Sequence, residues 1–363
     1  MDVQFLQSAV AQPFFCRFPQ GAAATLNKVK GSAFRLVPFL LPAPTNCGQW
    51  CLGGVRLTAD GKLNNKLDLE NGLGTLASTG IQAMTRRADM VMSETIANRT
   101  SIDQELKQGL NLWVDVSGER YETDSLDNNG SIKADMGDAA FGADIAVTDS
   151  FTTGAAIQYG NGSLRSNIAS IKNDIDSYDF TAYASQKFGA AKLVGELSYL
   201  QSGNEITSSQ AALNQDVDAK IYSAGIRGQY QLTAGNFQFI PSIGLRVSCL
   251  ETDAMTIGVV KVEDQKQRLV QMPIALRITG FEQNVSGWSL APSFKVAYVP
   301  TFGDKEIEVL GHEQDVIDTN PVQADFGLRL TNGDMLFNAD MMVSGGEAGT
   351  STIGAKVGMK YIF

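Results

Sequence analysis

The last eleven residues of the chain contain two alternating sets of side chains. One set is apolar and ends in two aromatics: Ile353, Ala355, Val357, Met359, Tyr361 and Phe363. The other set is small or basic: Gly354, Lys356, Gly358 and Lys360. Because successive side chains of a strand point to opposite faces, this pattern predicts a strand with one apolar and one polar face. Such a strand suits a wall between lipid and water.

The period of two continues through the chain after Leu110, where turn clusters separate the strands and no helical stretch interrupts them. We predict about twelve strands, near residues 110–120, 137–148, 150–161, 175–188, 191–203, 218–232, 236–250, 267–282, 286–299, 320–331, 334–345 and 350–363. Many of these segments exceed the roughly 9–11 residues that cross a membrane, so we expect some to extend beyond it.

Three features favour a transmembrane barrel over a soluble β-sandwich, which alternates in the same way. The strand count is even, and the apolar face carries aromatics near strand ends at Trp288, Tyr298, Tyr361 and Phe363. The opposite face is polar, small or charged in almost every strand. The predicted fold class is therefore all-β, a transmembrane antiparallel β-barrel of about twelve strands, with a soluble sandwich as the alternative.

Residues 77–109 contain helix formers without proline, and Gly80 and Gly109 bracket the predicted helix. Its charges have both signs and include Arg86, Arg87, Glu94 and Arg99. A helix that is polar on most faces has no broad stripe to bury against an apolar core, so it lies in solvent or in a polar channel. We expect this helix to thread the pore. A solvated linker helix is the alternative.

Charged residues recur on the polar face of the predicted strands. The acidic ones lie on early strands and the basic ones on later strands: Asp115, Asp138, Asp144, Asp179 and Glu196, then Arg227, Arg246, Arg277, Lys295 and Arg329. Twelve strands leave room inside for one helix. We expect these charges to line the pore and hold the helix. The alternative is that they only interact with one another across a water-filled pore.

Composition excludes several classes of function. The net charge of −10 and the pI near 4.7 argue against nucleic acid as a partner, since phosphate binding needs clustered Lys and Arg. The single histidine, His312, lies in a polar stretch that we predict to be a loop, so metal sites and histidine-based catalysis are not expected. We predict no catalytic residues and no cofactor.

The four cysteines do not define a set of disulfide bonds. Cys47 and Cys51 can pair in an oxidising compartment, but free thiols are an equal alternative. Alternation places Cys249 outward with Val247 and Leu245, as an apolar residue facing lipid. The amino terminus lacks the basic start of an ordinary signal peptide.

Two local motifs carry a family resemblance. The first predicted strand, Leu112 to Leu126, has a Trp within a few residues of the helix. The chain ends in the pattern of glycine, two residues, aromatic, one residue, aromatic, formed by Gly358, Tyr361 and Phe363. With the helix and the strand count, residues 77–363 resemble the translocator domain of classical autotransporters, the type V secretion proteins. The position before the glycine, often polar in that family, is Val357 here.

The resemblance implies a monomeric barrel in the outer membrane of a Gram-negative bacterium, surrounded by lipid and exporting its own passenger in cis. It implies that Gly358, Tyr361 and Phe363 are the signal read by the barrel assembly machinery. Residues 1–76 would be the end of a passenger or linker, 77–109 the pore helix and 110–363 the barrel. A diffusion channel of the porin kind is the alternative.

Some members of that family cut themselves at an Asn-Asn pair in the helix. Here the helix has only Asn98, followed by Arg99, and the pair Asn64-Asn65 lies upstream, so cleavage by that route is not expected.

Overall fold

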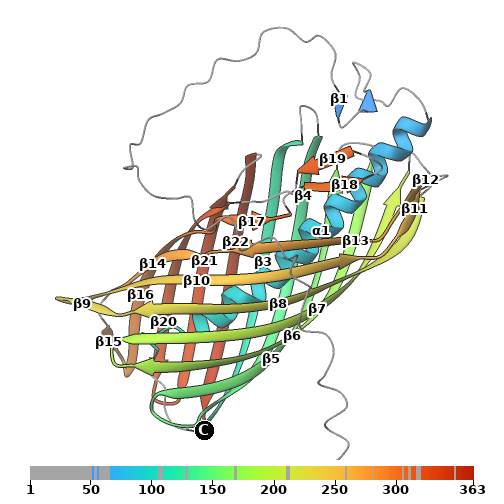
Figure 1. The fold of residues 1–363 in the computed structure, drawn as a ribbon. Coiled ribbons are helices and arrows are strands. Elements are labelled where there is room, and N and C mark those ends of the chain that lie inside the picture. The colour runs from blue at the N-terminus through green and yellow to red at the C-terminus, as the bar shows by residue number, and fades with distance from the viewer. Residues whose placement is uncertain are drawn as a thin grey trace, which may run out of the picture. The chain divides into compact units, whose positions relative to one another are not determined.

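The computed structural model describes residues 51–52, 55–56, 66–104, 109–126, 130–166, 170–209, 213–257, 260–280, 282–304, 306–309, 312–315, 320–346 and 349–363. All of them belong to one compact unit, Trp50–Phe363. The described part consists of one helix and a closed antiparallel barrel around it (Figure 1).

Twelve passes of the chain form the barrel wall. Seven long strands come first: β3 (Gly109–Leu126), β4 (Gly130–Ala146), β5 (Phe151–Ser166), β6 (Ile171–Phe188), β7 (Ala191–Ser208), β8 (Leu213–Tyr230) and β10 (Phe237–Thr252). The eighth pass is β13 (Gln265–Gln271) with β14 (Ile274–Thr279), and the ninth is β16 (Trp288–Tyr298) with β17 (Thr301–Gly303). The last three are β20 (Val322–Asn332), β21 (Met335–Gly345) and β22 (Thr350–Ile362). β22 pairs with β3 and closes the ring, which confirms the predicted barrel and its strand number.

Proline interrupts the hydrogen-bonded ladder in the eighth and ninth passes. Pro273 separates β13 from β14, because proline has no N–H to donate. The chain compensates locally: the amide of Gly244 donates to the carbonyl of Pro273, and the amide of Met272 donates to the carbonyl of Pro300. The pairing therefore continues across the break, and the predicted strand 267–282 is one pass with a kink.

Helix α1 spans Lys66–Arg99, so it begins and ends about ten residues earlier than the predicted 77–109. Gly109 is the first residue of β3, with φ +126°. A side chain there would meet the carbonyl of Phe363. After the helix ends at Arg99, Gln104 Nε2 donates to the carbonyl of Asn98 at 2.8 Å and satisfies one of the acceptors that the last turn leaves without a helical partner. No helix in the described part has an apolar stretch long enough to span a bilayer.

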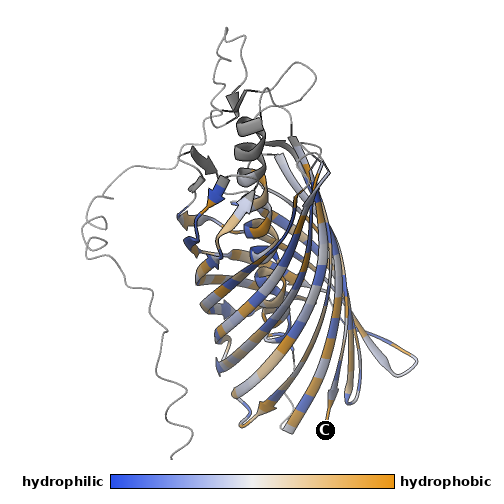
Figure 2. Ribbon diagram, turned by 90° about the vertical axis from the view of Figure 1, so that its right-hand side faces the viewer, coloured by the Kyte–Doolittle hydropathy of each residue, from blue (hydrophilic) through white to orange (hydrophobic). Residues whose placement is uncertain are grey.

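The face of a strand that carries the apolar side chains changes along its length, from the outside near one end to the inside near the other. In β6, Tyr178 and Phe180 are exposed on the outside and Asp179 is buried inside, as predicted. Nearer the other end of the same strand, Asp176 points outward and Ile175 is buried inside. The ribbon in Figure 2 accordingly carries both colours on every long strand.

The inversion divides the barrel into two zones. The C-terminus and short turns such as 189–190 and 333–334 lie at one end of the barrel, which we call the short-turn end. We call the opposite end the long-loop end. Between the zones, tyrosines of neighbouring strands contact one another on the outside: Tyr159 with Tyr178 at 5.3 Å and Tyr199 with Tyr222 at 5.1 Å between ring centroids.

At the long-loop end the inner face is an apolar core. It includes Ile132, Leu164, Ile175, Leu200 and Ile221, packed with Ile81 and Met84 of the helix. The expectation that the inner face is polar along almost every strand is therefore wrong for this zone. The physical reason is that strands of 16–18 residues rise past the roughly 9–11 that cross a membrane, and outside lipid the usual polar-outside arrangement returns.

Short elements complete the described part. They are β1 (Cys51–Leu52), β2 (Val55–Arg56), β9 (Leu232–Ala234), β11 (Met255–Ile257), β12 (Val260–Val262), β15 (Gln283–Val285), β18 (Glu306–Val309) and β19 (His312–Asp315). Met255 and Val262 of the β11–β12 hairpin belong to the apolar core. His312 pairs with Val309 in the β18–β19 hairpin, so the prediction of a plain loop was wrong. The stretch His312–Asp315 has no apolar alternation, the signal from which strands were predicted, although its backbone pairs with Glu306–Val309.

Cysteine placement differs in one respect from the sequence reading. Cys249 lies on the outward-facing side of β10, as alternation predicts, but its sulfur is disulfide-bonded. The pairing considered for Cys47 and Cys51 lies outside the residues whose side chains the structure describes.

Candidate functional site in the barrel lumen

From Leu76 to Arg99, helix α1 is buried on nearly all sides although it is polar. Ala77, Ser78, Ile81, Thr85, Ala88 and Ile96 are fully inaccessible, and Arg87, Asp89 and Arg99 are each less than a tenth exposed. Apolar contacts surround the half near the long-loop end, and polar contacts surround the other half. The lumen is thus the partner that a helix without an apolar stripe needs.

A charge cluster anchors the middle of the helix. Asp89 accepts a hydrogen bond from Arg246 of β10 at 2.7 Å. Arg246 also forms an ion pair with Glu196 of β7, and Glu196 accepts a hydrogen bond from Ser93 of the helix at 2.6 Å. The hydroxyl of Ser223 donates to Asp89 at 3.0 Å. One barrel guanidinium therefore joins two carboxylates, one from the helix and one from the wall.

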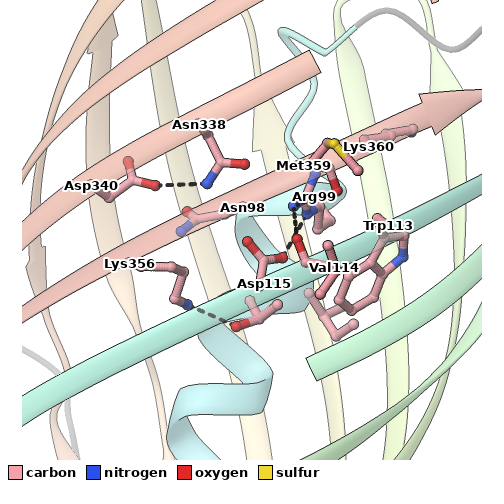
Figure 3. Close-up of polar contacts among 12 residues, drawn as sticks. Asn98, Arg99, Trp113, Val114, Asp115, Asn338, Asp340, Lys356, Met359 and Lys360 are labelled. Carbon is pink, nitrogen blue, oxygen red and sulfur yellow. Dashed lines mark hydrogen bonds and ion pairs between the residues drawn. The ribbon is translucent and has the colours of Figure 1, made fainter. Parts of the chain in front are cut away.

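Further contacts attach the helix to other strands. Arg87 donates to both oxygens of Glu119 in β3, each at 2.6 Å. Lys356 of β22 donates to the hydroxyl of Thr95 at 2.7 Å (Figure 3). Gln158 of β5 donates to the carbonyl of Ala88 at 3.2 Å. The helix is held from several sides of the lumen.

The last helical residue, Arg99, lies beside the closing seam between β22 and β3. Its Nε donates to Asp115 Oδ2 at 2.8 Å, and its Nη2 donates to the carbonyls of Val114 at 3.2 Å and Met359 at 3.4 Å. The guanidinium carbon lies 5.3 Å from the ring centroid of Trp113. One side chain therefore contacts both strands of the seam (Figure 3).

The turn after the helix docks at the short-turn end. The amide of Ile102 donates to Gln229 Oε1 at 2.9 Å. Asp103 accepts hydrogen bonds from Thr279 at 3.0 Å and from Arg329 at 3.2 Å. Burial alone would raise the pKa of the Asp103 carboxyl, but the positive charges of Arg277 and Arg329 hold that pKa below its ordinary value.

All ten charges predicted for the pore lie on the inner face. Five of them take part in four ion pairs: Asp115 with Arg99, Glu196 with Arg246, Lys295 with Asp325, and Arg329 with Asp103. Asp144 lies 3.7 Å from Lys360 and accepts a hydrogen bond from Asn111. Asp138 accepts from Gln158, Asp179 from Thr181, and Arg277 donates to Asn98. Arg227 has no hydrogen bond or ion pair with another residue of the described ranges.

The four predicted helix charges behave differently from one another. Arg87 and Arg99 pair with acids of β3. Arg86 donates to the carbonyl of Gln82 in its own helix at 3.1 Å. Glu94 lines a cavity beside the helix. Sequence reasoning missed Glu119 as an anchor, although its strand phase places it on the same face as Asp115.

The three residues of the predicted assembly signal do not share a face. Gly358 lies opposite Asp115 on the inner side, whereas the rings of Tyr361 and Phe363 contact each other edge to face at 4.7 Å. A Cβ at Gly358 would collide with Asp115 and Arg99. Packing alone therefore requires a glycine at position 358. The role of Gly358 in assembly stays a prediction.

The described residues contain no group of three or more His, Cys, Asp or Glu placed to hold a metal ion. The site is therefore a set of contacts between a helix and the barrel that surrounds it.

Comparison with known proteins identifies this arrangement. The family model described as the autotransporter β-domain matches residues 112–347. The translocator domain of the autotransporter NalP from Neisseria meningitidis is similar in structure, with a TM-score of 0.63, 17% identity, and coverage of 78% of this chain and 98% of that one. No curated protein sequence matches the chain.

Two further solved structures have the same fold. The transport unit of the autotransporter AIDA-I from Escherichia coli has a TM-score of 0.60 and 15% identity, covering 77% of this chain and 98% of its own. The β-domain of the Bordetella autotransporter BrkA has a TM-score of 0.53 and 12% identity, covering 70% and 99%. The chain therefore belongs to the autotransporter β-domain family, non-enzymatic translocators of the Gram-negative outer membrane.

Proposed function

We propose that this barrel exports the sequence that precedes its helix to the cell surface. The observation that supports export most directly is the path of α1. The helix enters the lumen from the long-loop end and ends at Arg99, beside the short-turn end where β3 begins. The start of the helix therefore lies at the opposite end of the barrel from the start of the first strand.

The loop lengths support the direction of export. In outer-membrane barrels the short turns face the periplasm and the longer loops face the exterior. Here the hairpins β11–β12 and β18–β19 lie at one end, and the two-residue turns 189–190 and 333–334 lie at the other. The start of the helix is then on the cell surface, which is where an exported passenger must be.

We further propose that outer-membrane lipid surrounds the exposed apolar side chains of the short-turn zone and that the barrel works as a monomer. Phe141, Phe180, Val357 and Phe363 are all more than half exposed in the isolated chain. Burying such surface in lipid is strongly favourable. The barrel assembly machinery is the proposed partner for insertion, with Gly358, Tyr361 and Phe363 as its signal.

The proposed division of the chain follows the helix. Residues up to about 65 are the end of a passenger or linker, Lys66–Arg99 is the pore helix, and the barrel begins at Gly109. A diffusion channel is the less favoured function, because the described lumen contacts hold the helix on several sides instead of leaving an open pore.

Protease accessibility on intact cells tests export. An epitope placed ahead of residue 66, in a chain supplied with an export leader, should be removed by added protease while the barrel stays in the membrane. A matched epitope in the 333–334 turn should be protected until the outer membrane is permeabilised. If the first epitope is also protected in intact cells, the export proposal is wrong.

A further inference from the structure

The pore helix has one face that is less deeply buried than the others. Between residues 83 and 98 its half-buried positions recur every three or four residues and form a single stripe: Ala83, Arg86, Met90, Glu94, Ala97 and Asn98. A cavity of about 120 Å³ lies along the part of this stripe that is nearer the short-turn end. The pore therefore has room for water on one side of the helix.

This room decreases toward the long-loop end. A second cavity, of about 30 Å³, extends along the helix as far as Ala83 and shares the lining residues Met90 and Gln271 with the first. Beyond it, every helix position from Leu76 to Gln82 is buried. The half-buried stripe of the helix thus ends at Ala83.

Apolar side chains surround the helix where the stripe has ended. Ala77 and Ile81 belong to the same buried cluster as residues of β5, β7 and the β11–β12 hairpin. The atom nearest to an added Cβ at Gly80 would be Leu164 Cδ2, at 3.5 Å, so helix and wall are in close contact there. We call the following six residues the apolar collar: Ala77, Ile81, Leu164, Ile206, Met255 and Val262.

The polar side chains of the helix at this level bond to the barrel wall. The hydroxyl of Ser78 donates to Gln265 Oε1 at 2.6 Å, and Gln82 Nε2 donates to the same oxygen at 2.7 Å. Gln265 is the first residue of β13. These two helix donors are therefore satisfied without water.

Two members of the collar come from outside the barrel wall. Met255 and Val262 lie opposite each other in the β11–β12 hairpin, which forms a sheet of its own. The helix contacts both strands of this hairpin (Figure 1). The base of the hairpin is joined to β8, where the amide of Asp253 donates to the carbonyl of Asp218 at 2.9 Å. The hairpin therefore covers the helix at the long-loop end.

We propose that the apolar collar is the permeability seal of the pore and that the β11–β12 hairpin is its lid. A narrow apolar constriction excludes ions, because an ion there loses its hydration and finds no polar groups to replace it. The polar half of the lumen holds the helix through its charged contacts and stays accessible to water. The proposal does not depend on export.

The conductance of the full chain in planar bilayers tests the seal. The unchanged protein should be nearly closed to small ions. Met255→Asn puts an amide into the collar and should raise the conductance severalfold, to a level below that of a barrel whose helix is deleted. Thr256→Asn is the matched control, because the neighbouring side chain is exposed, and it should leave the conductance low. Met255→Leu keeps the collar apolar and should also leave it low.

A variant in the polar half shows which zone of the lumen is the seal. Met90 lines both cavities, so Met90→Ala enlarges the space for water beside the helix. The conductance should nevertheless stay low, because the collar is intact. A conductance that rises in M90A and stays low in M255N would place the seal in the polar half and overturn the proposal.

Trypsin sensitivity distinguishes an open lid from a displaced helix. The mobility of the unheated protein on a gel shows that the M255N barrel is folded. Arg86 and Arg87 of the helix should then resist trypsin as they do in the unchanged protein, because the helix stays in the lumen. If trypsin cuts folded M255N at these arginines, its conductance comes from loss of the helix instead of an open collar, and the proposal is wrong.

Discussion

Arg99 and Asp115 form a buried ion pair of 2.8 Å directly behind the seam that closes the barrel. Arg99 is the last residue of the helix and Asp115 lies on the first strand, where it is opposite Gly358 of the last strand. The end of the helix and the closure of the barrel therefore share one set of contacts.

Replacing Arg99 by Gln should destabilise the barrel by about 3 kcal/mol, since removing one partner of a buried ion pair leaves the other charge uncompensated. Thermal unfolding in detergent, followed by the loss of heat-modifiable gel mobility, measures this. The exposed pair of Arg120 and Asp135 is the control, and R120Q should change stability by less than about 1 kcal/mol. If R99Q and R120Q lowered the stability equally, the Arg99–Asp115 pair would not be a stabilising buried ion pair.

Gly358→Ala should be destabilising because its Cβ would occupy the space of Asp115 and Arg99. Overpacking of this kind typically costs about 1–3 kcal/mol. Gly195→Ala is the matched control, since the nearest atom to its added Cβ is 4.0 Å away. Refolding yield and unfolding temperature report the difference.

The double variant R99A/G358A separates packing from recognition. If Gly358 is needed only to leave room, Gly358→Ala should cost less stability in the R99A background than in the unchanged chain, a coupling that the double-mutant cycle measures. If insertion into membranes is impaired by Gly358→Ala in both backgrounds to the same extent, the glycine is read by the assembly machinery.

Arg246→Gln should be the most destabilising change in the middle of the lumen. Asp89 and Glu196 would both lose their positive partner inside the barrel, at a cost of about 3–5 kcal/mol. Protease sensitivity of the helix in the folded barrel should rise together with the loss of stability. Ser93→Ala, which removes one hydroxyl hydrogen bond to the Glu196 carboxylate, should cost less, about 1.5–3 kcal/mol.

The turn after the helix should loosen in acid. The pKa of Asp103 is lower in the folded barrel than in the unfolded chain, so its stabilising contribution is complete above the unfolded pKa and disappears as the pH falls through the folded pKa. The protection factor of the Ile102 amide, which is corrected for the intrinsic pH dependence of exchange, should fall in that acidic range. Asp103→Asn should show fast exchange already at neutral pH and a flatter pH profile.

Deleting Lys66–Arg99 should raise the conductance of the barrel in planar bilayers strongly, because the helix fills most of the lumen. A deletion ahead of residue 66 of matched length should leave the conductance unchanged. Unchanged conductance without the helix would mean that it does not obstruct the pore.

The strand pattern was predictable because alternation reflects local geometry. Each of the twelve predicted segments overlaps one barrel pass, although early strands such as β3 and β4 extend beyond the predicted bounds. Outward residues such as Ile353 and Val357 were assigned to the correct face. The helix boundaries were less accurate. The turn after Arg99 contacts the last helical turn through the hydrogen bond from Gln104 to Asn98, and inner-face residues of distant strands pack around Ile81 and Met84. Both depend on residues far from the helix ends or on the closed barrel.

The sequence by itself determined the number of strands, the face of each side chain and the mixed polarity of the helix, because these depend on neighbours one or two positions away. Only the tertiary structure decided which charges meet. Asp89 contacts Arg246 across 157 positions of sequence, and Arg227 has no counterpart among the described residues. Such pairings depend on strand register and on how far the helix is inserted, and these are properties of the closed barrel as a whole.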